Sequence, residues 1–153
     1  MRYVALALLL ALSVGCNHRD PARAFPPRPS FSVGYLDVYM SRKLESDRTT
    51  RRLVQQAVMV HLVAFRKDFG PQGLVKRKLY VYSLARVNGP LRTGTLGYVK
   101  GDEAHVVAGG NLTCPWLYSQ LVNLHPKSRS ANLPRFLIDA WQDAAVARVL
   151  ALR

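Results

Sequence analysis

The first sixteen residues constrain this chain most, because they determine its compartment and exclude the signal peptide from the folded domain. Arg2 gives a positive start, a nearly unbroken apolar run covers residues 3–14, and Gly15-Cys16 closes the run before a polar stretch. A basic start, a short apolar segment and a small residue before the cut are typical of a secretory signal. The run is shorter than the roughly 20 apolar residues that a membrane-spanning helix needs. The pattern therefore predicts export, with residues 1–15 as the signal peptide.

The end of this segment, Leu12-Ser13-Val14-Gly15-Cys16, resembles the lipobox of bacterial lipoproteins. It departs from that family at Ser13, where the family usually has Leu. The resemblance implies that a diacylglycerol alkylates the Cys16 sulfur, that the peptide before it is removed, and that a fatty acid such as palmitate acylates the new amino terminus. Several acyl chains hold a protein stably, whereas one does not. Because Asn17 follows the cysteine in place of the retention signal Asp, the resemblance implies the outer membrane, facing the periplasm.

The alternative is ordinary signal-peptidase cleavage, for example at the small-x-small pattern of Ala22-Arg23-Ala24, which releases a soluble secreted protein. The second cysteine, Cys114, distinguishes the two interpretations. If Cys16 carries lipid, Cys114 has no intramolecular partner, because the chain contains only two cysteines. If Cys16 is free, a Cys16–Cys114 disulfide becomes possible in an oxidising compartment.

Removal of residues 1–15 leaves 138 of the 153 residues and lowers the net charge from +13 to about +12, because only Arg2 is lost. This length suits one domain with a real core. A large excess of basic over acidic side chains indicates an anionic partner. Export argues against nucleic acid, so the expected partners are anionic lipid, lipopolysaccharide or a cell-wall polymer. The alternative is a solvated basic surface without a specific ligand.

Hydropathy and turn residues predict the organisation of the exported chain. Four prolines between residues 16 and 30 indicate an extended tether after the lipidated cysteine. Residues 31–153 then form a single α+β domain, in which a small, mostly antiparallel sheet has one long helix before it and two helices after it. The predicted elements are a strand at 31–39, a helix from Asp47 to 69, strands at 79–87, 95–99 and 104–108, and helices at 115–124 and 134–152.

Two details of the predicted helices bear on the site. His61 lies on the apolar face of the first helix, where a lone histidine is more often a core residue with a satisfied hydrogen bond than a ligand. In the last helix, Ile138, Trp141, Ala145, Val149 and Leu152 are expected to share the apolar face, and Gln142 is expected to lie away from it with Asp139, Asp143 and Arg148.

The segment from Pro115 to His125 looks like the active helix of small zincin-type metallopeptidases, which carries His-Glu-x-x-His after a substrate-binding edge strand and before a further helix. That pattern needs two histidines facing one zinc and a glutamate that activates water. Here the matching positions are Ser119, Gln120 and Asn123. The resemblance therefore implies a degenerate active site in a non-catalytic domain that binds an envelope component, with no metal and no cofactor.

A competing interpretation is an envelope hydrolase that uses Cys114 as the nucleophile with His105 or His125 as the base, or an unrecognised site. A thiol near a helix N-terminus has a lowered pKa, which favours the reactive thiolate. The residues around Cys114 match no cysteine-hydrolase signature.

Overall fold

The computed structural model describes residues 24–71, 75–84, 91, 95–125 and 133–153. The predicted signal peptide and residues 16–23 of the predicted tether lie outside this part, as do residues 85–87 of a predicted strand. The described elements follow in the order β1 (Phe31–Val33), β2 (Leu36–Met40), α2 (Arg42–Glu45), α3 (Arg48–Phe69), β3 (Arg77–Tyr82), β4 (Gly97–Lys100), β5 (Glu103–Val107), α4 (Leu117–Leu124) and α6 (Arg135–Ala151). This arrangement confirms the predicted α+β class.

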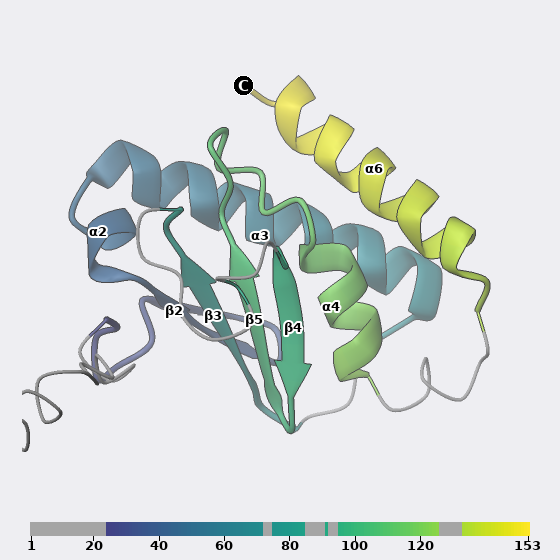
Figure 1. Ribbon diagram of the computed structural model, residues 1–153, viewed down its shortest axis with the longest axis horizontal. Helices are drawn as coiled ribbons and strands as arrows, with labels where there is room; N and C mark the ends of the chain where they lie inside the picture. The colour runs from purple at the N-terminus through teal and green to yellow at the C-terminus, as the bar shows by residue number, and fades with distance from the viewer. Residues whose placement is uncertain (1–23, 72–74, 85–90, 92–94, 126–132) are drawn as a thin grey trace, which may run out of the picture.

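Five strands form one mixed sheet in the order β1-β2-β3-β5-β4 (Figure 1). The outer pairs, β1 with β2 and β4 with β5, are antiparallel. The inner pairs, β2 with β3 and β3 with β5, are parallel. A parallel pair needs a crossover connection, and α3 supplies it between β2 and β3. The antiparallel pairing that the sequence predicts thus lies at the two edges of the sheet.

Glycines at two turns explain the antiparallel edges. Gly34 has a φ of +56° and turns the chain between β1 and β2, so the single strand predicted at 31–39 is a hairpin. Because of this turn, Tyr39 faces the opposite side of the sheet from Phe31 and Val33. The hairpin predicted around residues 100–103 is confirmed, and Gly101 provides its turn with a φ of +59°.

The long helix α3 has the beginning and the end that its sequence predicts. The Asp47 side chain accepts a 2.7 Å hydrogen bond from the Thr50 amide, which caps the first turn. Gly70, with a φ of +76°, ends the helix, and its amide donates to the Arg66 carbonyl. The face between these ends is buried, so α3 is the central helix of the core.

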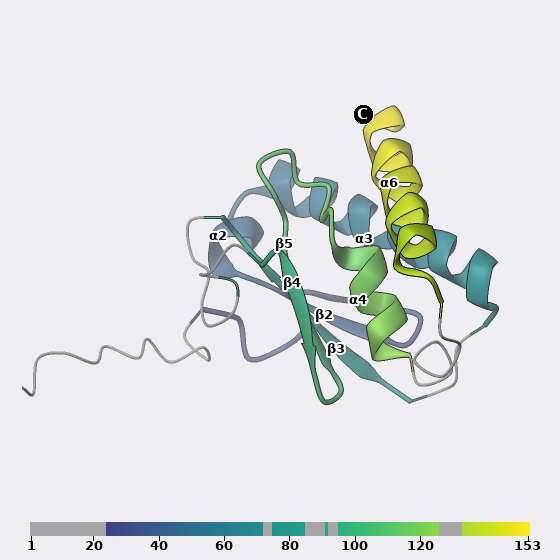
Figure 2. The same ribbon diagram turned by 45° about the vertical axis from the view of Figure 1, so that its right-hand side comes forward.

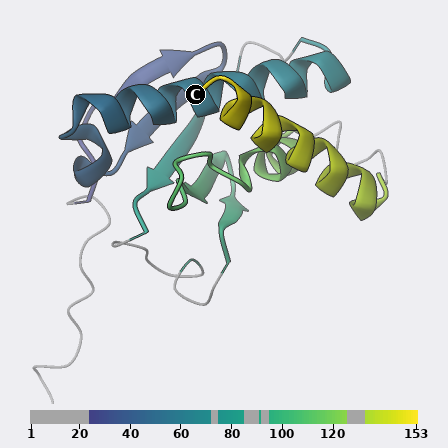
Figure 3. The same ribbon diagram turned by 90° about the horizontal axis from the view of Figure 1, so that it is seen from above.

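The helices α3, α4 and α6 cover the same face of the sheet (Figures 1 and 2). One cluster of buried side chains joins the inward residues of β2, β3 and β5 to α3, α4 and α6. The view from above shows α6 crossing α3 with its C-terminal end (Figure 3). No helix in the described residues is long and apolar enough to cross a membrane.

A smaller cluster lies on the other face of the sheet. Phe25, from the end of the predicted tether, is 5% exposed and packs edge-on against Tyr80 and Tyr82, with ring centroids 5.1 and 4.8 Å apart. The Ala24 carbonyl accepts from the Arg42 amide at 3.0 Å. Ala24 and Phe25 of the predicted tether therefore pack against the domain.

Candidate functional site

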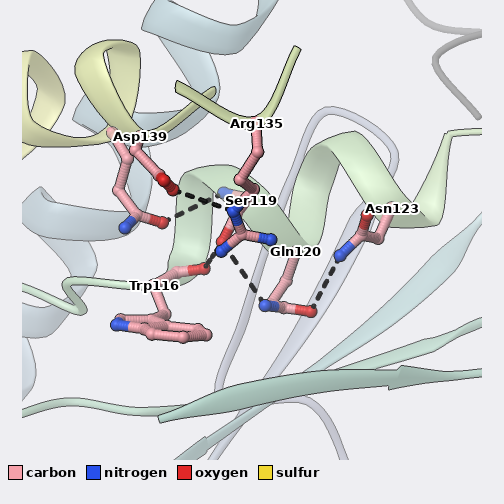
Figure 4. Close-up of polar contacts among 7 residues, drawn as sticks. Trp116, Ser119, Gln120, Asn123, Arg135 and Asp139 are labelled. Atoms are coloured by element: carbon pink, nitrogen blue, oxygen red, sulfur yellow. Dashed lines mark hydrogen bonds and ion pairs between the residues drawn. The ribbon is translucent and has the colours of Figure 1, made fainter. Parts of the chain in front are cut away.

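The three positions singled out on the predicted active helix form a continuous polar chain along α4 (Figure 4). The Ser119 hydroxyl donates to the Trp116 carbonyl at 3.1 Å. The Gln120 amide donates to the Ser119 hydroxyl at 3.4 Å, and the Asn123 amide donates to the Gln120 side-chain oxygen at 3.5 Å. Ser119 and Gln120 are buried and Asn123 is exposed, so the chain runs from the core to the surface.

A fourth polar side chain, Gln142 of α6, joins this group, which we call the amide cluster: Ser119, Gln120, Asn123 and Gln142. The Gln142 side-chain oxygen accepts from the Ser119 backbone amide at 3.4 Å, and Gln142 is 7% exposed. The prediction that Gln142 lies away from the apolar face is wrong. The signal was available, because Gln142, Ala145 and Val149 have the spacing i, i+3 and i+7 of one buried helical face. The prediction that Leu152 belongs to that face is wrong as well, because α6 ends at Ala151 and Leu152 is 59% exposed.

The edge strand β4 and the start of α6 close the amide cluster on two sides. A Cβ atom on Gly97 of β4 would lie 2.9 Å from Gln120 Cγ, so α4 approaches this strand as closely as only a glycine permits. On the other side, the Arg135 guanidinium lies 5.7 Å from the centre of the Trp116 ring and forms a 3.0 Å ion pair with Asp139. The cluster is therefore packed between α4, α6 and β4.

We expect Gly97→Ala to destabilise the domain by about 1–3 kcal/mol, because the added methyl group overpacks the contact between β4 and Gln120. Chemical denaturation measures this change in the free energy of unfolding. Gly110→Ala is the matched control, since a Cβ atom there meets nothing within 4 Å. Equal stability of the two variants would show that α4 does not pack on β4 at this distance. Adding Gln120→Ala to Gly97→Ala should restore part of the lost stability.

His105, one of the two candidate bases, is held in a row of rings on the open face of the sheet. Its ring stacks between Tyr80 and Tyr98, with centroids 4.9 and 4.5 Å away. Its Nδ1 atom is 3.0 Å from the Tyr82 hydroxyl, and its Nε2 atom is 3.8 Å from a Glu103 oxygen. Burial lowers the pKa of His105 to about 4, against the opposing influence of Glu103. His105 is thus neutral at pH 7 and both of its nitrogens face other side chains.

Cys114 has the surroundings of a structural cysteine. It is fully buried in the core cluster, and burial raises the pKa of its thiol to about 12. The helix that follows begins only at Leu117, and desolvation has the larger effect on the thiol. Cys114 also has a φ of +50°, a conformation that is rare for a residue other than glycine. The other candidate base, His125, lies at the C-terminal end of α4 with its ring 6.1 Å from that of Phe65.

The prediction for His61 is confirmed. The residue is fully buried, and its Nε2 atom is 2.9 Å from the Thr113 carbonyl oxygen. Since a carbonyl can only accept, the proton sits on Nε2. The Nδ1 atom is buried without a hydrogen-bond partner among the described residues. Burial lowers the pKa of His61 to about 4, so the ring is neutral.

The chemistry that this arrangement permits is limited. Among the described residues, no group of three or more His, Cys, Asp or Glu side chains is placed to hold a metal ion. The amide cluster contains one hydroxyl and three carboxamides, none of which changes its protonation state near neutral pH. No protein-family model, curated protein or solved structure matches this chain.

Proposed function

We propose that this chain is an exported lipoprotein, anchored in the outer membrane by acyl chains on Cys16, whose folded domain is non-catalytic and binds an anionic component of the cell envelope. The observation that carries the non-catalytic part is the amide cluster. It lies on α4 between the edge strand β4 and the following helix α6, and this order of elements supports the zincin-like resemblance.

The residue types in the amide cluster support this proposal. Zinc in proteins binds thiolate, imidazole and carboxylate groups, and a catalytic zinc needs three such ligands plus water. Hydroxyl and carboxamide groups at these positions instead form hydrogen bonds with one another and with the backbone at the N-terminal end of α4. A buried hydrogen-bonded network of this kind stabilises one packing of α4 against α6, which suits a binding domain.

The net charge supports the anionic partner. About twelve excess positive charges remain after removal of the signal peptide. Anionic lipid, lipopolysaccharide and acidic wall polymers are the polyanions of this compartment. A long-range electrostatic attraction to any of them would weaken as salt is added.

Zinc binding by the wild-type domain, and by a variant that introduces zinc ligands, tests the proposal. The wild-type domain should carry far less than one zinc per chain after dialysis, measured by atomic absorption. The triple variant Ser119→His/Asn123→His/Gln142→Glu should retain about one zinc per chain, because it places three ligands where zinc requires them. Binding should also raise the melting temperature of this variant, since a metal held only by the folded state stabilises it.

A matched control separates a shaped site from a pair of histidines on any helix. Gln55→His/Met59→His introduces the same i, i+4 pair on the exposed side of α3. If a correctly folded triple variant binds no more zinc than this control, α4 and α6 do not have the proposed zincin-like geometry. Stoichiometric zinc on the wild-type domain would contradict the non-catalytic assignment. Circular dichroism of each variant establishes that it is folded.

A further inference from the structure

The outer side of the helical layer, away from the sheet, carries two hollows that adjoin at Leu152. The first has a volume of about 530 Å³ and is lined by Arg48 and Arg52 of α3 and by Arg153. The second has a volume of about 420 Å³ and is lined mainly by apolar side chains, including Met59 and Val63 of α3. We call the two together the arginine–valine face.

The apolar half of this face is strongly exposed. Val63 is 61% exposed, Leu152 59% and Met59 42%. Arg148 of α6 also lines this hollow, so a cation borders the apolar side chains at this end too. Exposed apolar side chains rimmed by cations mark a surface that contacts another phase or molecule.

The basic half is not explained by the stability of α3. Arg48 and Arg52 lie in the first turns of the helix, where the helix dipole is positive and cations are unfavourable. Residues 48–67 contain no acidic side chain, and within the described part of the chain neither arginine forms an ion pair. Arg153 donates to the carbonyls of Asn111 and Leu112, which holds its guanidinium at the rim. The guanidinium groups of Arg48 and Arg52 therefore remain available to an anion from outside the domain.

We propose that the arginine–valine face docks on a bilayer surface that contains anionic phospholipid. The guanidinium groups of Arg48 and Arg52 would contact lipid phosphates, and Val63, Met59 and Leu152 would enter the boundary between headgroups and acyl chains. Guanidinium matches phosphate geometry, and an amphipathic helix face with basic and apolar residues binds anionic membranes in this way. The charge of the face thus matches the surface to which the chain is anchored.

This inference rests on the proposed lipid anchor, which makes weak docking sufficient. The stretch from Cys16 to Ala24 spans at most about 30 Å when fully extended. A short tether keeps the domain at a high effective concentration beside the bilayer, so a face with modest affinity is occupied much of the time. Docking would then fix the orientation of the domain at the membrane.

The test uses the full mature chain with Cys16→Ser, which has no acyl anchor, and vesicles of phosphatidylcholine with or without phosphatidylglycerol. Sedimentation should show binding only when phosphatidylglycerol is present. Arg48→Gln/Arg52→Gln should weaken it about thirtyfold at low salt, because each basic residue at an anionic surface contributes about 1 kcal/mol. Lys78→Gln/Lys100→Gln removes the same charge from the opposite face of the sheet and should change binding much less.

The apolar half has its own matched pair. Val63→Ser should weaken vesicle binding about fivefold, whereas Val75→Ser, at an equally exposed valine outside the face, should not. A polarity-sensitive dye on Val63→Cys should shift to the blue on vesicles, because the face places it at the boundary between headgroups and acyl chains. The dye labels this position alone, because Cys114 is fully buried.

Equal losses from the arginine and lysine pairs would overturn the inference in favour of diffuse attraction by net charge. An unshifted dye would overturn it too, as would a change in the sedimentation coefficient of Val63→Ser without vesicles, since that would assign the face to contact between copies of the chain. Each of these results leaves the zinc test unaffected. Stoichiometric zinc on the wild-type domain would contradict the proposed function without altering the vesicle result.

Discussion

Cys16→Ser is expected to abolish the acylated form of the protein completely. A serine hydroxyl cannot replace the thiolate that the diacylglycerol transfer requires, so the chain should accumulate with residues 1–15 still attached. Mass spectrometry of the membrane fraction measures this directly. The wild-type chain should begin at an acylated Cys16, and the variant should carry the mass of the uncut signal peptide.

Cys114→Ser is the matched control for this experiment, because Cys114 is the only other cysteine in the chain and lies fully buried. It should be acylated and processed like the wild type. A wild-type chain that begins at Phe25, or elsewhere, without lipid would contradict the anchor. In that case a Cys16–Cys114 disulfide would be possible only if cleavage left Cys16 in the mature chain.

The second large effect is a loss of stability as the pH falls from about 6.5 to about 4. His61 has a pKa of about 4 in the folded domain and an ordinary value near 6.5 when unfolded. Its pKa is lowered by folding, so its contribution is complete above pH 6.5 and is lost as the unfolded chain takes up a proton. A difference of about 2.5 pH units corresponds to roughly 3 kcal/mol. His105 acts in the same direction, since burial lowers its pKa as well.

Denaturant unfolding at several pH values between 7 and 4 measures this slope. His61→Gln should flatten it, because the glutamine amide can still donate to the Thr113 carbonyl but does not titrate in this range. Adding His105→Gln should flatten it further. The carboxylates with lowered pKa values, Asp37 and Asp47, act only at lower pH, so they do not obscure the effect. An unchanged slope in both variants would show that neither ring is neutral in the fold.

Local signals in the sequence were sufficient for α3 and for the hairpin of β4 and β5, but not for the hairpin of β1 and β2 or for the short helix α2. Asp47 and Gly70 mark the ends of α3, and the apolar spacing between them identifies its buried face. Gly101 marks the turn between β4 and β5. These features depend on contacts between residues close together in the chain, such as the bond from the Thr50 amide to Asp47, so they can be read without knowledge of the fold.

The amide cluster depends partly on contacts between residues that are distant in the sequence. Sequence alone identified Ser119, Gln120 and Asn123, because they share a helix at known spacing. It missed Gln142, because the bond from Ser119 joins residues 23 positions apart on different helices. It also gave the wrong direction for the thiol of Cys114, because proximity to a helix in the sequence carries no information about desolvation.

The sequence by itself therefore determined α3, α4 and α6, the hairpin of β4 and β5, and the chemical types of the candidate site residues. Only the tertiary structure decided that β2, β3 and β5 pair in parallel, that Gln142 joins α4, and that Arg48, Val63 and Leu152 share one exposed face. The physical reason is the range of the interactions. Caps, turns and periodicity are set within a few residues, whereas parallel pairing, burial and surface patches depend on which distant segments the folded core brings together.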